Sequence, residues 1–193
     1  MTSFYKKPNQ AQLRLATLGM ILATILAACS GGGGQAEIIA NVNGEPITRE
    51  MFNAEWLIPN VISEELGQVP LIIPKDELLN EMVNSILMAQ SAQEAGFTVS
   101  DQEVQQDLAL FLANLGTTQE EFETRLVENG ITWSMLEKIV RRNLIVNKYQ
   151  NDYVLSRVAE SERQDVLNSW LNVLKEQSTI EFEPDFLDQI GNE

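Results

Sequence analysis

Apolar residues alternate with other residues near both ends of the region 37–183 and follow a helical period between them. Every second residue from Ile38 to Val42 is apolar, which predicts a short strand, and Asn43-Gly44 predicts a turn after it. Residues 179–183 alternate in the same way. Because two strands alone are only marginally stable, we predict that residues 38–43 pair with 179–183 and pack on helices.

The chain between these strands has the pattern of successive helices. Thr48 is a predicted N-cap, and Pro59 is expected to end the helix that Thr48 opens. Residues 58–74 are expected to be irregular because they contain several prolines and a glycine. A helix over 74–95 should follow, because proline is tolerated at a helix start and Gly96 is a typical helix end.

Later helix starts carry capping signatures, in which Ser or Thr precedes an acidic or amide residue by three positions. They are Ser100 with Glu103, Thr117 with Glu120, Thr132 or else Ser134 with Glu137, and Ser161 with Gln164. The third should open a long helix to about Val158. The last should open a helix with a buried apolar stripe of Val166, Leu167, Trp170, Leu171 and Leu174. The pattern predicts a mainly α-helical domain with a small two-stranded β element that joins its N- and C-terminal ends.

The first 30 residues have the layout of a secretory signal. Three basic residues precede an uncharged apolar run over 15–26, and small residues then lead to Cys29. A Cys directly after Leu26-Ala27-Ala28 resembles the lipobox of bacterial lipoproteins. The resemblance implies cleavage before Cys29, lipidation of Cys29, and attachment to a bacterial membrane outside the cytoplasm. A buried thiol in a helix and a transmembrane helix are the alternatives, although the run is shorter than the roughly 20 residues that a span needs.

Charge and composition argue against several functions. The chain has 28 acidic and 13 basic residues and a net charge of −15. Loss of Lys6, Lys7 and Arg14 with the signal would leave 10 basic against 28 acidic residues, a net charge of −18. Such a surface repels nucleic acid and anionic headgroups, so lipid rather than charge would hold the protein on a membrane.

The absence of histidine is the most informative feature of the composition. The chain contains no histidine and one cysteine, which removes the commonest general base and the commonest transition-metal ligands. We therefore expect no metal, no cofactor, no disulfide, and no Ser-His-Asp or Cys-His catalysis.

Several segments, in order, resemble the SurA-type chaperone domain of extracytoplasmic folding factors. The segment from Ile39 to Thr48 resembles the opening of that domain. The further matching segments are Ala95 to Glu103, Gly130 to Trp133, Arg141 to Ile145, and Leu171 to Glu181. The resemblance covers most of residues 37–183 and implies a helical SurA/trigger-factor-like chaperone fold.

The sequence departs from this family where its catalytic part would stand. Members that resemble this chain, such as the PrsA-like lipoprotein foldases, usually carry parvulin prolyl isomerase domains between the long helix and the last helix. Here that junction is Val158 to Ser161, and the histidines of a parvulin site are missing. The resemblance therefore implies the chaperone module without prolyl isomerase activity.

The expected organisation is a lipoprotein signal peptide over 1–28, a lipidated Cys and Gly-rich tether over 29–36, a SurA-like domain over 37–183, and a frayed acidic tail over 184–193.

The predicted function is that of a membrane-anchored extracytoplasmic holdase, which binds unfolded or newly exported polypeptides and is not an enzyme. Such binding needs adaptable apolar side chains, and methionine is suited to that role. The candidate peptide-binding residues are Met51, Phe52, Trp56, Leu71, Ile72, Ile73, Met82, Met88, Phe111 and Met135. The run 71–73 is the strongest candidate, because loops seldom bury three consecutive large apolar residues. The alternatives are that these residues fill the core, and that the protein is a dedicated assembly lipoprotein that binds one specific partner.

Overall fold

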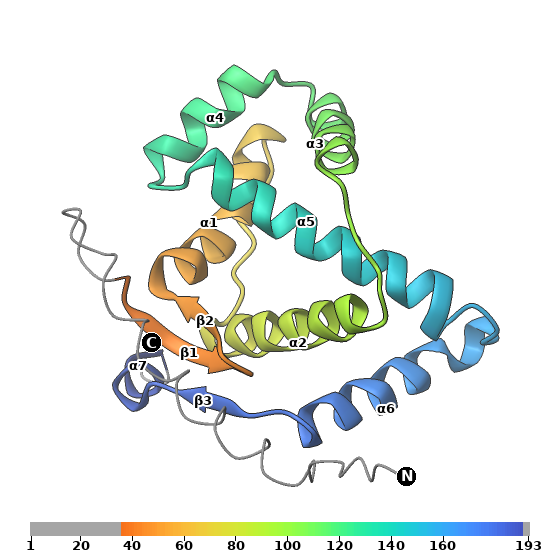
Figure 1. Cartoon of the computed structure of the whole chain (residues 1–193). Helices are drawn as coiled ribbons and strands as arrows, with labels where there is room; N and C mark the ends of the chain where they lie inside the picture. The colour runs from red at the N-terminus through yellow and green to blue at the C-terminus, as the bar shows by residue number, and fades with distance from the viewer. Residues whose placement is uncertain (1–35, 191–193) are drawn as a thin grey trace, which may run out of the picture. The chain divides into compact units, whose positions relative to one another are not determined.

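Helices and one small sheet form the part of the chain that the computed structural model describes, residues 36–190 (Figure 1). Predicted features before residue 36, including Cys29, lie outside the described residues. The elements are β1 (Ile38–Val42), β2 (Glu45–Thr48), α1 (Arg49–Glu65), α2 (Lys75–Glu94), α3 (Asp101–Leu115), α4 (Gln119–Glu128), α5 (Trp133–Tyr149), α6 (Arg163–Glu176), β3 (Ile180–Phe182) and α7 (Pro184–Ile190). A π-helical turn (Gln150–Val154) and a 3₁₀ turn (Glu160–Glu162) lie between α5 and α6. The predicted mainly α-helical fold is therefore confirmed.

The sheet joins the two ends of this region, as predicted, but it has three strands. Its order is β2-β1-β3, and β1 pairs antiparallel with β3 through Ala40 opposite Phe182 and Val42 opposite Ile180. The expectation of two strands missed β2, which pairs with β1 on its other side. Asn43 and Gly44 connect β1 to β2 with φ angles of 52° and 89°, the left-handed conformation of a tight hairpin turn.

Helix α1 continues through Pro59, so the prediction that Pro59 ends it is wrong. Proline in a helix interior costs about 3 kcal/mol. Ile58 and Val61, on either side of Pro59, are both buried in one core cluster with residues of α3, α4 and α5. Burial of two such side chains contributes about 1.5–3 kcal/mol each, which offsets the proline. The irregular segment is accordingly shorter than predicted and covers only residues 66–74.

The capping signals place most of the helix starts. Ser100 and Glu103 form the predicted box at α3, and Thr132 rather than Ser134 caps α5. At α4 the box is Thr118 with Glu121, one residue later than predicted. The shift has a local cause, because the N–H of Thr117 closes the end of α3 by donating to the Leu112 carbonyl at 3.2 Å.

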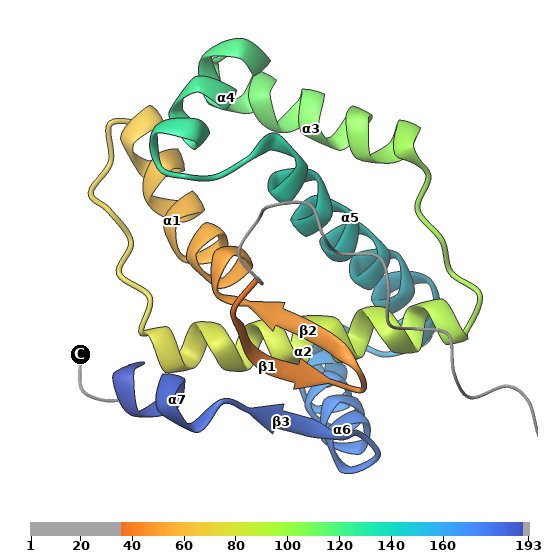
Figure 2. The same ribbon diagram turned by 60° about the vertical axis from the view of Figure 1, so that its left-hand side comes forward.

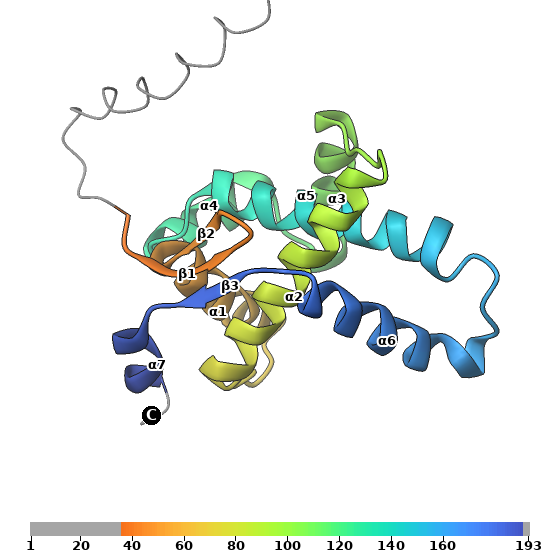
Figure 3. The ribbon, with the colours of Figure 1, turned by 60° about the horizontal axis from the view of Figure 1, so that its bottom comes forward.

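The connection from α5 to α6 differs from the prediction at both ends. The α-helix ends at Tyr149 instead of Val158, and the π-helical turn follows it. No side chain caps α6, so the box predicted at Ser161 is absent. The apolar stripe of α6 is half-buried rather than buried. It packs beside α2 (Figure 3). The Trp170 ring lies 5.5 Å from that of Tyr149.

The C-terminal segment is a helix where a frayed tail was expected. Phe186 of α7 is 2% exposed and belongs to the core cluster of the sheet, α1 and α2. Its ring lies edge-on to that of Phe52 with centroids 5.1 Å apart, and the Arg49 guanidinium lies 4.8 Å from its centroid. The expectation of fraying is therefore wrong for residues 184–190, because one aromatic side chain docks that segment.

Candidate binding cleft

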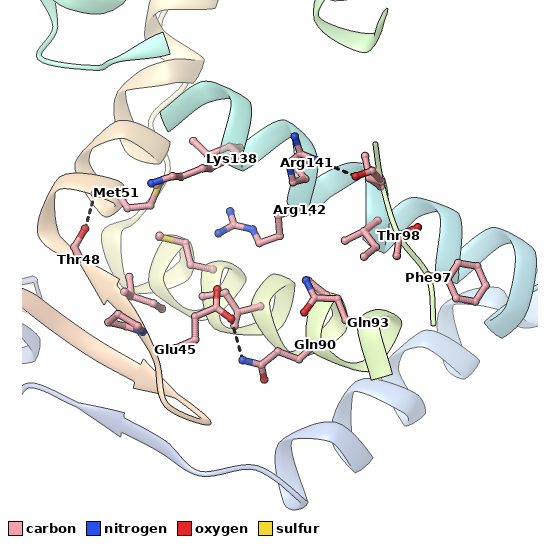
Figure 4. A pocket seen from close by; sticks show the side chains of 18 residues that line it. Glu45, Thr48, Met51, Gln90, Gln93, Phe97, Thr98, Lys138, Arg141 and Arg142 are labelled. Carbon is pink, nitrogen blue, oxygen red and sulfur yellow. Dashed lines mark hydrogen bonds between the residues drawn. The ribbon is translucent and has the colours of Figure 1, made fainter. Parts of the chain in front are cut away.

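A cleft of about 730 Å³ opens between β2, α2, the segment 97–99 and α5 (Figure 4). Pockets of roughly 300–1,000 Å³ hold small ligands, so this cleft has room for a few side chains rather than a folded partner. Its lining residues are Glu45, Pro46, Ile47, Thr48, Met51, Met82, Ile86, Ala89, Gln90, Gln93, Phe97, Thr98, Val99, Lys138, Ile139, Arg141, Arg142 and Ile145.

Apolar side chains from different elements form much of the cleft. Met82 and Ile86 come from the buried side of α2, and Ile145 comes from the buried side of α5. Met51 and Ile139 are half-buried and also line the cleft. The elements meet there because α2 and α5 each have an apolar face, and α2 packs directly on α5 (Figure 2).

One half-buried and one exposed ion pair hold the α5 side of the cleft. Arg142 donates to the Glu55 carboxylate of α1 at 2.7 Å, and the two side chains are only 15% and 13% exposed. Arg141 donates to the Val99 carbonyl at 2.8 Å and to Asp101 at 2.6 Å. These bonds tie α5 to α1 and to the segment that leads into α3, which sets the width of the cleft.

Amide and carboxylate groups line the opposite side. The Gln90 amide donates to the Val42 carbonyl at 3.1 Å and to the Glu45 carboxylate at 3.0 Å. Gln90 thus ties α2 to the β1–β2 hairpin. The cleft therefore has an apolar middle, three cations on α5 and one carboxylate on β2 (Figure 4).

The sequence of the chain matches one known family over most of its length. The family described as the SurA-like N-terminal domain matches residues 1–150. The chain belongs to this family. Relatives include the chaperone SurA of Burkholderia lata, 29% identical over 160 residues that make up 78% of this chain and 35% of the relative. The chaperone SurA of Hahella chejuensis is 29% identical over 108 residues, 53% of this chain and 25% of the relative. This SurA-like chain thus spans about a third or less of the length of these relatives.

A solved structure with some similarity to this SurA-like domain comes from Campylobacter jejuni. It was described in a study of PEB4 and the periplasmic protein Cj1289, two structurally related SurA-like chaperones of that organism. It is 18% identical, covers 64% of this chain and 44% of that chain, and has a TM-score of 0.38.

Two of the residues predicted for peptide binding line the cleft of this SurA-like domain, namely Met51 and Met82. Phe52 does not line the cleft, because it is 2% exposed and packs on Phe186 in the core. Phe111 and Met135 are half-buried against the cluster of α1, α3, α4 and α5. Met88 is half-buried in a third cluster, between α2, α5 and α6.

The proline-bounded loop forms a second, separate apolar surface. Leu71 and Ile72 are 58% and 87% exposed, while Ile73 packs against the core. The Trp56 indole donates to the Ile73 carbonyl at 3.2 Å and anchors the loop on α1. None of the residues that line the cleft belongs to the loop 66–74, which joins α1 to α2 at the edge of the domain (Figure 2).

Sequence reasoning missed several cleft residues, among them Phe97, Val99, Ile139 and Ile145. Their spacing suits an ordinary helix face or a short link, so nothing local separates them from core residues. The pair Arg141-Arg142 could have pointed to the cleft, because two adjacent basic residues stand out in so acidic a chain.

Neither a metal cluster nor a membrane-spanning helix is found among residues 36–190. No group of three or more metal-binding side chains occurs there. None of the helices there is long and apolar enough to cross a membrane.

Glu103 connects the cap of α3 to α5 and should make stability depend on acid pH. A hydrogen bond from Lys148 is the largest cause that lowers the pKa of Glu103 from 4.5 to about 2, and hydrogen bonds from Ser100 add to it. A pKa lowered in the folded state stabilises the protein above pH 4.5, and this contribution is lost as the pH falls toward 2. We expect Glu103→Gln to lower the melting temperature at pH 7 and to matter progressively less below pH 4.5. The same change at the exposed Glu81 is the control, and a pH-independent difference between Glu103→Gln and wild type would contradict the assignment.

Proposed function

We propose that this SurA-like protein is an extracytoplasmic chaperone that binds short apolar segments of unfolded or newly exported polypeptides in the cleft between β2, α2 and α5. The observation that carries this proposal is the size and lining of the cleft, an apolar space of about 730 Å³ walled by polar groups. Membership of a family whose relatives are named chaperones supports it.

The chemistry of the cleft suits weak and sequence-tolerant binding. The half-buried Met51 lines it, and a flexible thioether chain repacks around different shapes. Buried apolar side chains support it from below, so the cleft persists without a bound segment. Such a site holds a polypeptide without performing chemistry on it, and the chain has no histidine for a parvulin-type reaction. We therefore propose a holdase that lacks prolyl isomerase activity.

A lipid on Cys29 would attach this holdase to a membrane surface in our proposal. The basic start, the apolar run and the residues before Cys29 support it. Attachment confines a weak binder to a thin layer beside the membrane and raises its effective concentration near emerging segments.

An aggregation assay tests the proposed chaperone function. The domain from residue 36 onward should suppress light scattering when chemically denatured citrate synthase is diluted into buffer. It should not accelerate the isomerisation of a proline-containing peptide, which takes tens to hundreds of seconds uncatalysed. Unchanged scattering at a several-fold molar excess would contradict the holdase. Faster isomerisation would contradict the absence of enzymatic activity.

Two double variants identify the surface that binds. Met51→Gln with Ile139→Gln changes half-buried cleft residues to polar ones of similar size, and should abolish most of the suppression. Leu71→Ser with Ile72→Ser changes only exposed loop residues and should leave suppression nearly intact. Melting temperatures near that of the wild type verify both folds. The opposite result would place binding on the loop.

The alternative is a dedicated assembly lipoprotein that binds one specific partner. Such a protein would fail the aggregation assay with an unrelated denatured protein. It would instead co-purify from its own cell with one protein in a fixed ratio. Capture of many unrelated exported polypeptides favours the holdase.

A further inference from the structure

The cations of the cleft stand out against the charge of the chain. The whole sequence has 28 acidic and 13 basic residues, yet the residues lining the cleft include three cations and one carboxylate. Lys138, Arg141 and Arg142 all come from α5, at positions i, i+3 and i+4, which share one face of a helix. An acidic domain thus presents a locally basic wall in its cleft.

Two of these cations already have partners within the domain. Arg141 bonds Val99 and Asp101, and Arg142 bonds Glu55. Lys138 is exposed, and no carboxylate among the described residues lies within ion-pair distance of it. Its ammonium group in Figure 4 extends along the cleft toward Met51. Lys138 is therefore the cation of this wall that can pair with a bound group without breaking an existing bond.

The opposite wall, on β2, carries a negative charge. Glu45 lies there, with its carboxylate held by Gln90. A carboxylate on a bound segment would be repelled at this side and attracted at the α5 side. The polar groups thus give the cleft a direction, with the apolar space of Met82 and Ile86 between the two walls.

We infer that the cleft prefers polypeptide segments in which an acidic side chain neighbours a large apolar residue, and that Lys138 pairs with this acid. The inference rests on the proposed function and adds a substrate class to it. The apolar side chain enters between α2 and α5, and the carboxylate reaches the ammonium of Lys138. Because the pair is partly exposed, the preference should be modest, about two- to five-fold in Kd.

Fluorescence anisotropy with three labelled peptides tests the preference. The peptides carry the same label, are blocked at both ends and differ only in Asp, Asn or Lys beside a central Leu-Phe pair, so the tested residue is the only charge that differs. At physiological salt the Debye length is about 8 Å, which screens the net charge of the domain but not a contact pair. We expect the Asp peptide to bind wild type two- to five-fold more tightly than the Asn peptide, and the Lys peptide to bind most weakly.

Changes at Lys138 should alter the order of the peptides. Lys138→Gln should remove the difference between the Asp and Asn peptides, and Lys138→Glu should make the Lys peptide the tightest. Lys175→Gln and Lys175→Glu make the same charge changes on α6, away from the cleft, and should preserve the wild-type order. Effects equal to those at Lys138 would mean that net charge decides, which overturns the inference.

The two proposals can fail separately. If all three peptides bind wild type with equal Kd and the cleft double variant abolishes binding, the preference is wrong and the client cleft stands. If none of the peptides binds at millimolar concentration, the client cleft itself is wrong and the preference falls with it. An unchanged order of affinities in Lys138→Glu would also overturn the inference.

Discussion

Phe186→Ala is expected to lower the free energy of unfolding by about 3–5 kcal/mol, the usual cost of removing a buried phenylalanine. Phe186 is 2% exposed and packs edge-on against Phe52 of α1. Its loss would leave a cavity where α7 meets the sheet cluster and would remove the ring beneath Arg49. Urea unfolding followed by circular dichroism measures the change.

The neighbouring residue supplies a matched control. Leu187 follows Phe186 on α7 but is 41% exposed, so Leu187→Ala should change stability by no more than about 1 kcal/mol. Similar small losses for both variants would mean that α7 does not dock on the core in solution. A stable Phe186→Ala variant would also restore the sequence-based expectation of a frayed tail.

Cys29→Ser is expected to release the protein completely from the membrane. A serine hydroxyl cannot take the thioether-linked lipid, and an acidic surface gives no electrostatic attachment to anionic membranes. Stable anchoring needs about two acyl chains, because one chain binds only marginally. Expression in a bacterium that processes lipoproteins, followed by membrane sedimentation and intact-mass measurement, would show the shift.

The adjacent Ser30 gives the control for anchoring. Ser30→Ala leaves the thiol in place and should remain in the membrane fraction with the added lipid mass. If Cys29→Ser also stays in the membrane fraction, the apolar run 15–26 holds the protein as a membrane segment. The circular dichroism of the released protein should match that of the wild type, since Cys29 contributes nothing to the elements described between residues 36 and 190.

Local signals predicted the helices well where caps and glycines mark their ends. Ser100, Thr132 and Gly96 determine boundaries through hydrogen bonds or backbone angles within a few residues of themselves, so the sequence alone carries that information. These local signals gave the wrong helix end where packing against distant parts of the chain outweighs the local free-energy cost of a proline in a helix. Pro59 stays helical because its neighbours are buried against α3, α4 and α5.

The candidate site was only partly predictable for a related reason. Met51 and Met82 were chosen because methionine suits adaptable binding, and both line the cleft. Phe52, next to Met51, was chosen as an apolar residue of the same helix, and it lies in the core without lining the cleft. Adjacent residues of a helix point in directions about 100° apart, and which direction meets solvent depends on the elements that pack around it.

The sequence by itself determined the helical composition, the pairing of the two ends of the domain, the acidic surface and the absence of histidine chemistry. Only the tertiary structure decided that β2 forms, that α7 docks through Phe186, and that a cleft exists. The physical reason is distance along the chain. The cleft joins residues from Glu45 to Ile145, and only the packing of α2 on α5 brings them together.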